Sequence, residues 1–138
     1  MISLRKHVFE PLYYMGKRSS MLKYWKKLEK TQYLSESHLL EKQWEKLKDI
    51  IKYSYHKNSF YKKKYDVSGI HPEDIKNVDD ILKIPVLTKK EIRENVHGMI
   101  SNGYNIHQLM KFKTGGSTGK PLELFITEEC SEQRNACA

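Results

Sequence analysis

Residues 110–126 read MKFKTGGSTGKPLELFI, and this stretch decides the fold class that we predict for the chain. Before the glycines, Met110 and Phe112 alternate with lysines, and after them the aliphatic residues at 122, 124 and 126 alternate with Glu, Phe and Thr. A period of two residues is typical of β-strands. We therefore predict two strands that are joined by a glycine-rich loop at residues 114–121.

Helical patterns precede this unit. The clearest predicted helix runs from about Glu36 to His56, because apolar residues recur there every three or four positions. Residues 1–30 also have a helical pattern, which Pro11 disturbs and Gly16 interrupts. The sequence therefore predicts a helical N-terminal part with a break near its beginning.

Short capped helices and one final helix complete the predicted elements. Residues 67–100 read as a series of such short helices, and Thr88 with Glu91 has the spacing of a capping box. Beyond the second strand, Thr127 is placed to cap a C-terminal helix. We predict an α/β chain with an α+β arrangement in this stretch, in which a mostly helical N-terminal two-thirds is followed by the β-loop-β unit and that helix.

Composition and charge limit the function. The 138 residues suffice for one domain, and 38% hydrophobic with 30% charged residues argue against disorder throughout. Residues 1–64 contain sixteen Lys and Arg against six Asp and Glu, whereas residues 65–138 contain nine against eleven. A basic front could bind nucleic acid or an anionic membrane. We favour a solvated helix face, because the lysines are interleaved with apolar residues.

The sequence offers little sign of a membrane span, a secretion signal or a metal site. No apolar run approaches the ~18–20 residues that cross a bilayer, and residues 1–7 lack the pattern of a secretion signal. Cys130 and Cys137 would lie about 10 Å apart on one helix, too far for a disulfide. We expect free thiols, scattered histidines that bind no metal, and a cytoplasmic location.

Three interpretations compete for the loop Thr114–Pro121. It could be a plain turn, but that does not explain two hydroxyls and a lysine beside the glycines. It could be the P-loop of a nucleotide triphosphatase, but the glycine spacing is too short, and Pro121 stands where a Ser or Thr must bind magnesium. The third interpretation is another kind of phosphate-binding loop, whose backbone N–H groups converge on one anion.

The loop resembles the phosphate loop of adenylate-forming enzymes, and upstream motifs narrow the resemblance. Three of them, in this order, are similar to the N-terminal region of phenylacetate–coenzyme A ligase-like proteins, in particular the branch associated with capsular polysaccharide biosynthesis. They are Tyr55–Tyr61 (YHKNSFY), Gly69–Ile75 (GIHPEDI) and Leu82–Lys89 (LKIPVLTK). The similarity extends over nearly the whole chain.

The resemblance implies an activity and a set of ligands. In this family the loop holds the β- and γ-phosphates of ATP while a substrate carboxylate attacks the α-phosphorus, which yields an acyl-adenylate and pyrophosphate. ATP with Mg²⁺ and a small carboxylic acid are the implied ligands, coenzyme A is a candidate acceptor, and no specific nucleic acid is implied. The implied cofactor-binding residues are Thr114, Gly115, Gly116, Ser117, Thr118, Gly119 and Lys120.

These loop residues have different implied roles. Ser117 and Thr118 would donate hydrogen bonds from their hydroxyls, the three glycines would permit close backbone approach, and Lys120 would offset the charge on the leaving pyrophosphate. The family's adenine, ribose and magnesium contacts and its catalytic lysine have no counterpart here, so we predict neither catalytic residues nor metal ligands in this chain.

We accordingly expect an N-terminal fragment of the large domain of an adenylate-forming enzyme, inactive by itself. Its predicted segments are a basic helical segment (1–66), short capped helices (67–100) and the strand–loop–strand–helix (101–138), all within one truncated AMP-binding domain. The alternatives are a basic helical binding module, with the loop incidental, or a non-functional gene remnant. A fragment would leave strand edges and apolar surface uncovered, so we predict marginal stability.

Overall fold

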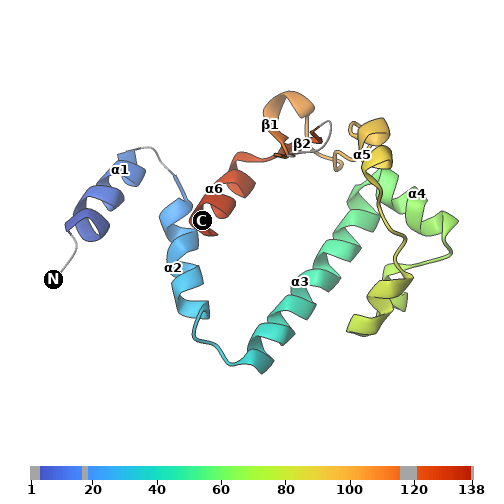
Figure 1. Ribbon diagram of the computed structural model, residues 1–138, viewed down its shortest axis with the longest axis horizontal. Coiled ribbons are helices and arrows are strands. Elements are labelled where there is room, and N and C mark those ends of the chain that lie inside the picture. The colour runs from blue at the N-terminus through green and yellow to red at the C-terminus, as the bar shows by residue number, and fades with distance from the viewer. Residues whose placement is uncertain (1–3, 17–18, 116–120, 138) are drawn as a thin grey trace. The chain divides into compact units, whose positions relative to one another are not determined.

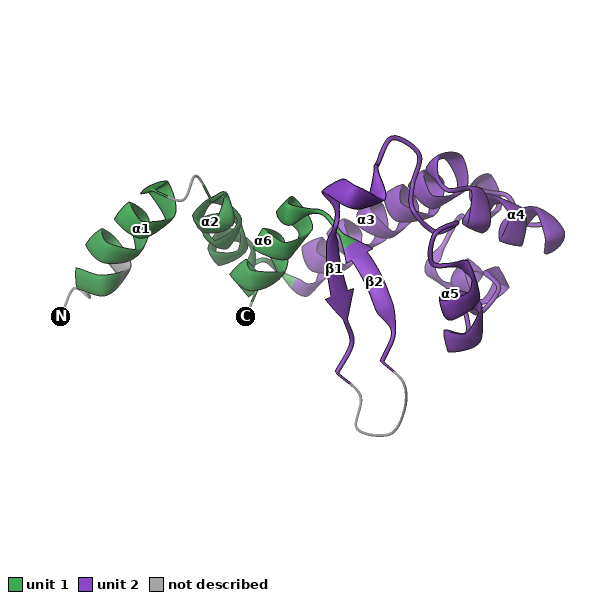
Figure 2. Cartoon of the chain, turned by 90° about the horizontal axis from the view of Figure 1, so that it is seen from above, with its two compact units in different colours: residues 1–35, 126–138 green, residues 36–125 purple. Residues whose placement is uncertain are grey.

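The computed structural model describes residues 4–16, 19–115 and 121–137, and the side chain of Lys6 is outside this description. The described chain forms two compact units (Figure 2). Unit 1 combines residues 1–35 with residues 126–138, and unit 2 comprises residues 36–125. The three-segment division at 66/67 and 100/101 stays a prediction.

Unit 1 is helical. It begins with a π-helical stretch, η1 (Arg5–Phe9), followed by α1 (Glu10–Gly16) and α2 (Met21–Thr31), so the predicted break in the N-terminal helix is present. The final helix, α6 (Glu128–Cys137), returns to pack beside α2, as Figures 1 and 2 show. Thr127 caps α6 as predicted, because its hydroxyl oxygen accepts the N–H of Cys130 at 3.1 Å.

Polar contacts accompany the packing of α2 on α6. The Tyr24 hydroxyl donates a hydrogen bond to the Glu129 carboxylate, and the N–H of Ser20 donates to Glu132 Oε2 at 3.0 Å. Ser20 precedes the first turn of α2, where unpaired N–H groups and the helix dipole favour an anion. Glutamates of α6 therefore stabilise the start of α2.

Unit 2 is built on a long helix. This helix, α3 (Glu36–Lys57), matches the predicted span to within one residue and precedes α4 (Ser59–Val67). Four short helical elements lie between α4 and β1 (Met110–Lys113). They are η2 (Pro72–Asp74), η3 (Val78–Lys83), α5 (Lys89–Asn95) and η4 (Ile106–Gln108). β2 (Glu123–Ile126) completes a two-stranded antiparallel sheet, so the predicted α+β class is confirmed.

Side-chain caps begin the short elements. Thr88 and Glu91 form the predicted capping box, in which Thr88 Oγ1 accepts the N–H of Glu91 at 3.2 Å and Glu91 Oε2 accepts the N–H of Thr88 at 2.8 Å. Asn77 and His71 begin η3 and η2 in the same reciprocal manner. These caps satisfy N–H groups that the first helical turn leaves without partners.

The core of unit 2 is small. Ile51, Tyr65 and Ile75 are buried together, and their partly buried neighbours are Trp44, Leu47, Tyr55, Tyr61, Ile70 and Ile84. Elsewhere in the described ranges many large hydrophobic side chains are exposed, for example Leu82 at 90%. The predicted marginal stability stays a prediction, and a cooperative thermal melt at high temperature would contradict it.

One buried polar side chain connects distant parts of unit 2. Asn58, 3% exposed, caps α4 by accepting the N–H groups of Phe60 and Tyr61 at 3.1 and 3.2 Å. Its Nδ2 donates to the carbonyl oxygen of Met99 at 2.5 Å, and next to it the N–H of Asn102 donates to the carbonyl of Lys57 at 2.6 Å. The α3–α4 junction therefore anchors the segment that leads into β1.

Candidate functional site

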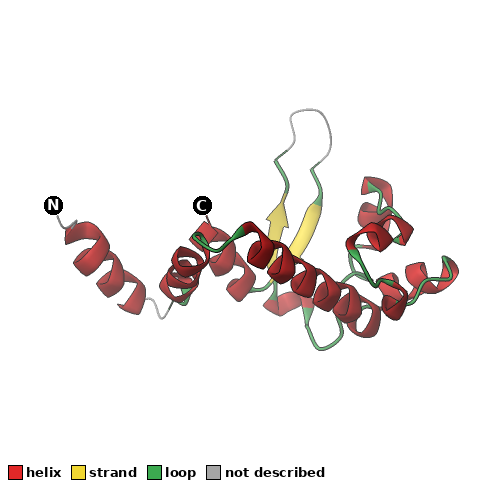
Figure 3. Cartoon of the chain, turned by 90° about the horizontal axis from the view of Figure 1, so that it is seen from below, coloured by secondary structure: helices red, strands yellow, loops and turns green. Residues whose placement is uncertain are grey.

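The predicted loop connects β1 with β2, which pair as an antiparallel hairpin (Figure 3). Two hydrogen bonds close the base of the loop: the N–H of Thr114 donates to the carbonyl of Leu122 at 3.0 Å, and the N–H of Leu122 donates to Thr114 Oγ1 at 3.0 Å. The alternating sequence forms the two strands, and the threonine joins their ends. The hairpin thus confirms the predicted β-loop-β unit.

The structure describes two of the seven predicted site residues, Thr114 and Gly115. Thr114 is half-buried at the base of the loop, and a hydroxyl that accepts one hydrogen bond can also donate one. Gly115 is exposed, and a Cβ atom added there would meet no atom of the described residues within 4 Å. The described residues therefore leave room beside the first glycine of the loop.

The other predicted site residues, Gly116, Ser117, Thr118, Gly119 and Lys120, lie outside the described residues. Their proposed contacts with a nucleotide therefore stay predictions.

Charged side chains on one face of the hairpin favour an anion near its tip. Lys111 and Lys113, two residues apart on β1, both form ion pairs with Glu123 of β2. The Nζ atom of Lys111 lies 2.7 Å from Glu123 Oε2, and the Nζ atom of Lys113 lies 3.2 Å from Glu123 Oε1. The hydrogen bond from Lys111, and then that from Lys113, lower the pKa of the Glu123 carboxyl. Two ammonium groups against one carboxylate leave one positive charge in excess at the base of the loop, although solvent screens such exposed groups.

Apolar contacts hold the hairpin in unit 2. Leu122 is buried, with 9% of its surface exposed, although it adjoins the loop. The centre of the Phe125 ring lies 6.4 Å from the centre of the His97 ring, and His97 follows α5. The end of β2 therefore contacts the helical part of unit 2.

Sequence reasoning missed two features of this site. It identified Thr114 as part of the loop but not its pairing with Leu122, because a turn sequence does not specify which side chain will close it. It recorded the alternation of Lys111 and Lys113 with apolar residues but not their shared contact with Glu123. Opposite charges on strands that face each other across a short loop are the signal that could have revealed this contact.

The described residues give no sign of a metal centre or of a bilayer span. Nowhere in the described ranges do three or more His, Cys, Asp or Glu side chains gather as a metal ion would require. Within the same ranges, each helix is too short or too polar to cross a bilayer.

Sequence comparison finds several phenylacetate-coenzyme A ligases that are similar to this chain. The chain is 29% identical over 103 residues to a phenylacetate-coenzyme A ligase of Escherichia coli (strain K12), a match that covers 74% of this chain and 23% of that protein. It is 31% identical over 105 residues to the enzyme of the same name from Aromatoleum evansii, with 72% and 23% covered. The chain is related in sequence to phenylacetate-coenzyme A ligases.

The similarity extends to a third phenylacetate-coenzyme A ligase, from Pseudomonas putida, at 28% identity over 91 residues, with 65% of this chain and 20% of that protein covered. No protein-family model matches the chain. The chain spans about a quarter of the length of these phenylacetate-coenzyme A ligases.

Proposed function

We propose that this chain is the N-terminal part of an ATP-dependent, carboxylate-activating ligase of the adenylate-forming class, and that its glycine-rich loop binds the phosphate tail of ATP. The observation that carries the proposal is a hairpin closed by Thr114 and Leu122, in a chain related to phenylacetate-coenzyme A ligases. Two lysines at its base provide a positive environment for an anion.

The proposed reaction joins a carboxylate to the α-phosphorus of ATP. A carboxylate oxygen forms the new bond, the bond between the α-phosphorus and the oxygen bridging to the β-phosphate breaks, and pyrophosphate leaves with the electron pair. The chain would contribute position and charge: N–H groups at Gly115, Gly116 and Gly119, hydroxyls of Ser117 and Thr118, and the ammonium group of Lys120. Such preorganised donors act where negative charge develops.

The proposal includes the wider set of ligands and the cellular context. Phenylacetate-coenzyme A ligases, by their name, act on phenylacetate and coenzyme A; for this chain we propose a small carboxylic acid as substrate and coenzyme A as a candidate acceptor. We also propose a cytoplasmic location and membership of the capsular polysaccharide-associated branch.

Magnesium is part of the proposal only for the complete enzyme. The acidic and histidine side chains of the described residues form no cluster that fits a metal ion. We therefore assign no step of the reaction to magnesium ligands from this chain. Because the chain spans about a quarter of its relatives, we propose that adenylation requires the remaining part of such an enzyme.

A chimera tests the loop in a complete enzyme. The matched segment of the Escherichia coli phenylacetate-coenzyme A ligase is replaced by this chain, and ATP–pyrophosphate exchange is measured with phenylacetate. Lys120→Ala should lower kcat/KM about 10- to 100-fold, because a hydrogen bond to a charged group contributes about 1.5–3 kcal/mol. Lys63→Ala, at an exposed lysine of α4, is the matched control and should leave exchange unchanged. Equal exchange in both variants would remove the loop from the mechanism.

A second measurement uses the 138-residue chain itself. Pyrophosphate is added during ¹H–¹⁵N NMR, and the amide signals of residues 114–120 should shift more than that of Gly103, a glycine in a turn outside the loop. Shifts in the loop no larger than the shift at Gly103 would contradict phosphate binding, whether or not the chimera folds.

A further inference from the structure

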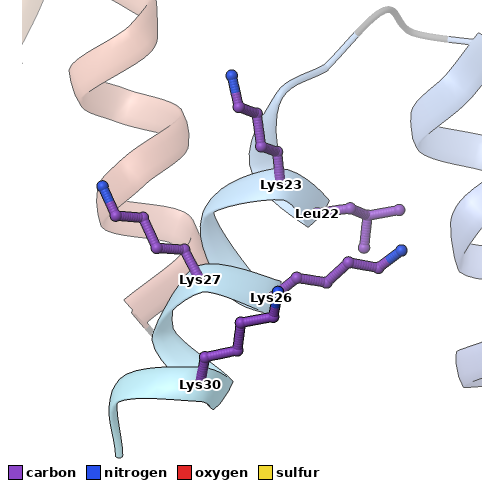
Figure 4. Close-up of a pocket in the computed structure, with 5 residues that line it drawn as sticks. All are labelled: Leu22, Lys23, Lys26, Lys27 and Lys30. Carbon is purple, nitrogen blue, oxygen red and sulfur yellow. The ribbon is translucent and has the colours of Figure 1, made fainter.

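Helix α2 has a stripe of lysines on one face. Lys23, Lys26, Lys27 and Lys30 are all exposed, and at 100° per residue they fall within a sector of about 100° of the helix surface. Together with Leu22 they line a surface hollow of about 460 Å³ (Figure 4). The stripe is thus a continuous basic surface within unit 1.

The charges of this stripe are not neutralised by the part of the chain that the structure describes. None of the four lysines has an ion-pair partner there, and the described hydrogen bonds between α2 and α6 come from the Tyr24 hydroxyl and the N–H of Ser20. Lys23 with Lys27, and Lys26 with Lys30, are like charges four residues apart, an arrangement that destabilises a helix slightly. Helix stability alone therefore gives no reason for the stripe.

The same unit exposes a set of apolar side chains. Leu4, Val8, Phe9, Leu12 and Met15 belong to η1 and α1 or border them, and between 43% and 73% of each is exposed. Their spacing of mostly three or four residues places several of them on one side of a helix. Exposed apolar groups gathered in this way mark a surface that another molecule, or the remaining part of a longer protein, covers.

The two features together select the class of partner. Figure 4 shows that the four lysine side chains leave α2 in different directions, so their ammonium groups do not converge on one small anion. A nucleic acid would satisfy the lysines but not the apolar side chains. The interface of an anionic lipid bilayer satisfies both, because its headgroup phosphates attract lysines and its acyl boundary accepts apolar groups.

We propose that unit 1 binds the surface of anionic lipid bilayers. The lysine stripe of α2 contacts the headgroups, and the apolar side chains of residues 4–15 enter the boundary between headgroups and acyl chains. This inference is independent of the proposed ligase activity, since neither α1 nor α2 contains a residue of the loop. It would place the enzyme at a membrane without a spanning helix.

Vesicle binding of the 138-residue chain tests the proposal. The chain should sediment with vesicles of phosphatidylcholine mixed with phosphatidylserine and not with phosphatidylcholine alone, and added sodium chloride should release it. Each lysine near an anionic surface strengthens binding about fivefold. The triple variant Lys26→Gln, Lys27→Gln, Lys30→Gln should therefore bind about 100-fold more weakly.

A matched control separates the stripe from net charge. Lys42→Gln, Lys46→Gln, Lys63→Gln removes the same charge from exposed positions of α3 and α4 and should leave vesicle binding within a few-fold. Equal losses in the two triple variants would reduce the effect to net charge and overturn the proposal. Circular dichroism of both variants should show unchanged helix content, since all six lysines are exposed.

The apolar part has its own control. Phe9→Ala should weaken vesicle binding about tenfold, because a large apolar side chain leaves the interface. Leu82→Ala, which removes a 90% exposed leucine from η3, should not change vesicle binding.

Absence of binding to the mixed vesicles overturns the proposal. Binding to duplex DNA that depends on the stripe, without binding to vesicles, would also overturn the proposal, because the partner would then be a nucleic acid.

Discussion

Replacing Asn58 with alanine should lower the free energy of unfolding of unit 2 by about 2–3 kcal/mol. The substitution removes an acceptor from two N–H groups at the start of α4, and loss of such a cap costs ~1 kcal/mol. It also removes the donor to the Met99 carbonyl. A buried carbonyl without a partner costs ~1–3 kcal/mol, and the lower half of this range applies to a part-buried group.

Related variants separate the two contributions. Asn58→Ser retains an oxygen that can cap α4 but has no amide to reach Met99, so it should cost about half as much as alanine, ~1 kcal/mol. Asn105→Ala is the matched control, because Asn105 is exposed and caps η4 through a single hydrogen bond to the N–H of His107 at 3.0 Å. Its effect should stay below ~1 kcal/mol.

Urea unfolding measures these effects, with the fluorescence of Trp44 as the reporter, since Trp44 packs against the core of unit 2. All variants carry Trp25→Phe, so that Trp44 is the one remaining tryptophan of the chain. A loss below 1 kcal/mol for Asn58→Ala would refute the reasoning. A serine variant as unstable as the alanine variant would show that the cap contributes nothing and that the contact with Met99 accounts for the whole effect.

Three further predictions concern pH, the core and the loop base. A hydrogen bond from Lys64, and others from Thr88, lower the pKa of Glu91 from its usual value near 4.5 to about 2. The contribution of the ionised Glu91 to stability is therefore complete above pH 4.5 and is lost as the pH falls toward 2. Glu91→Gln should flatten this part of a plot of the urea midpoint against pH. Ile51→Ala should destabilise unit 2 by ~2–4 kcal/mol in urea unfolding, while Ile50→Ala, at a 56% exposed neighbour, should cost less than ~1 kcal/mol. Thr114→Val should speed amide hydrogen exchange at Leu122 about tenfold by removing its acceptor, whereas Thr114→Ser should not.

Local signals in the sequence predicted most of the secondary structure. The apolar period of three to four residues located α3 to within one residue of its observed end. The Thr88–Glu91 spacing located the start of α5, and the period of two located both strands. Each of these signals lies within a few residues of the element that it specifies, because a helix turn or a strand pair closes its hydrogen bonds over short distances.

Some local features still escaped prediction. His71 caps η2 by accepting the N–H of Glu73, although histidine is not among the residues usually expected at that position. The loop was located by its glycines and hydroxyls, but the lysines beside it were not connected with Glu123, since that contact depends on how β1 and β2 align.

The sequence alone determined the order of helices and strands, the position of the loop and the uneven charge, because these follow from residue type and spacing. Only the tertiary structure decided which partners meet: Tyr24 with Glu129 across 105 residues, Asn58 with Met99 across 41, and Lys64 with Glu91 across 27. It also decided that the described hydrogen bonds from α2 to α6 come from Tyr24 and Ser20 and not from the lysines of α2. Such pairings depend on the path of the whole chain, since the same residue types recur at many positions and only packing brings particular ones together.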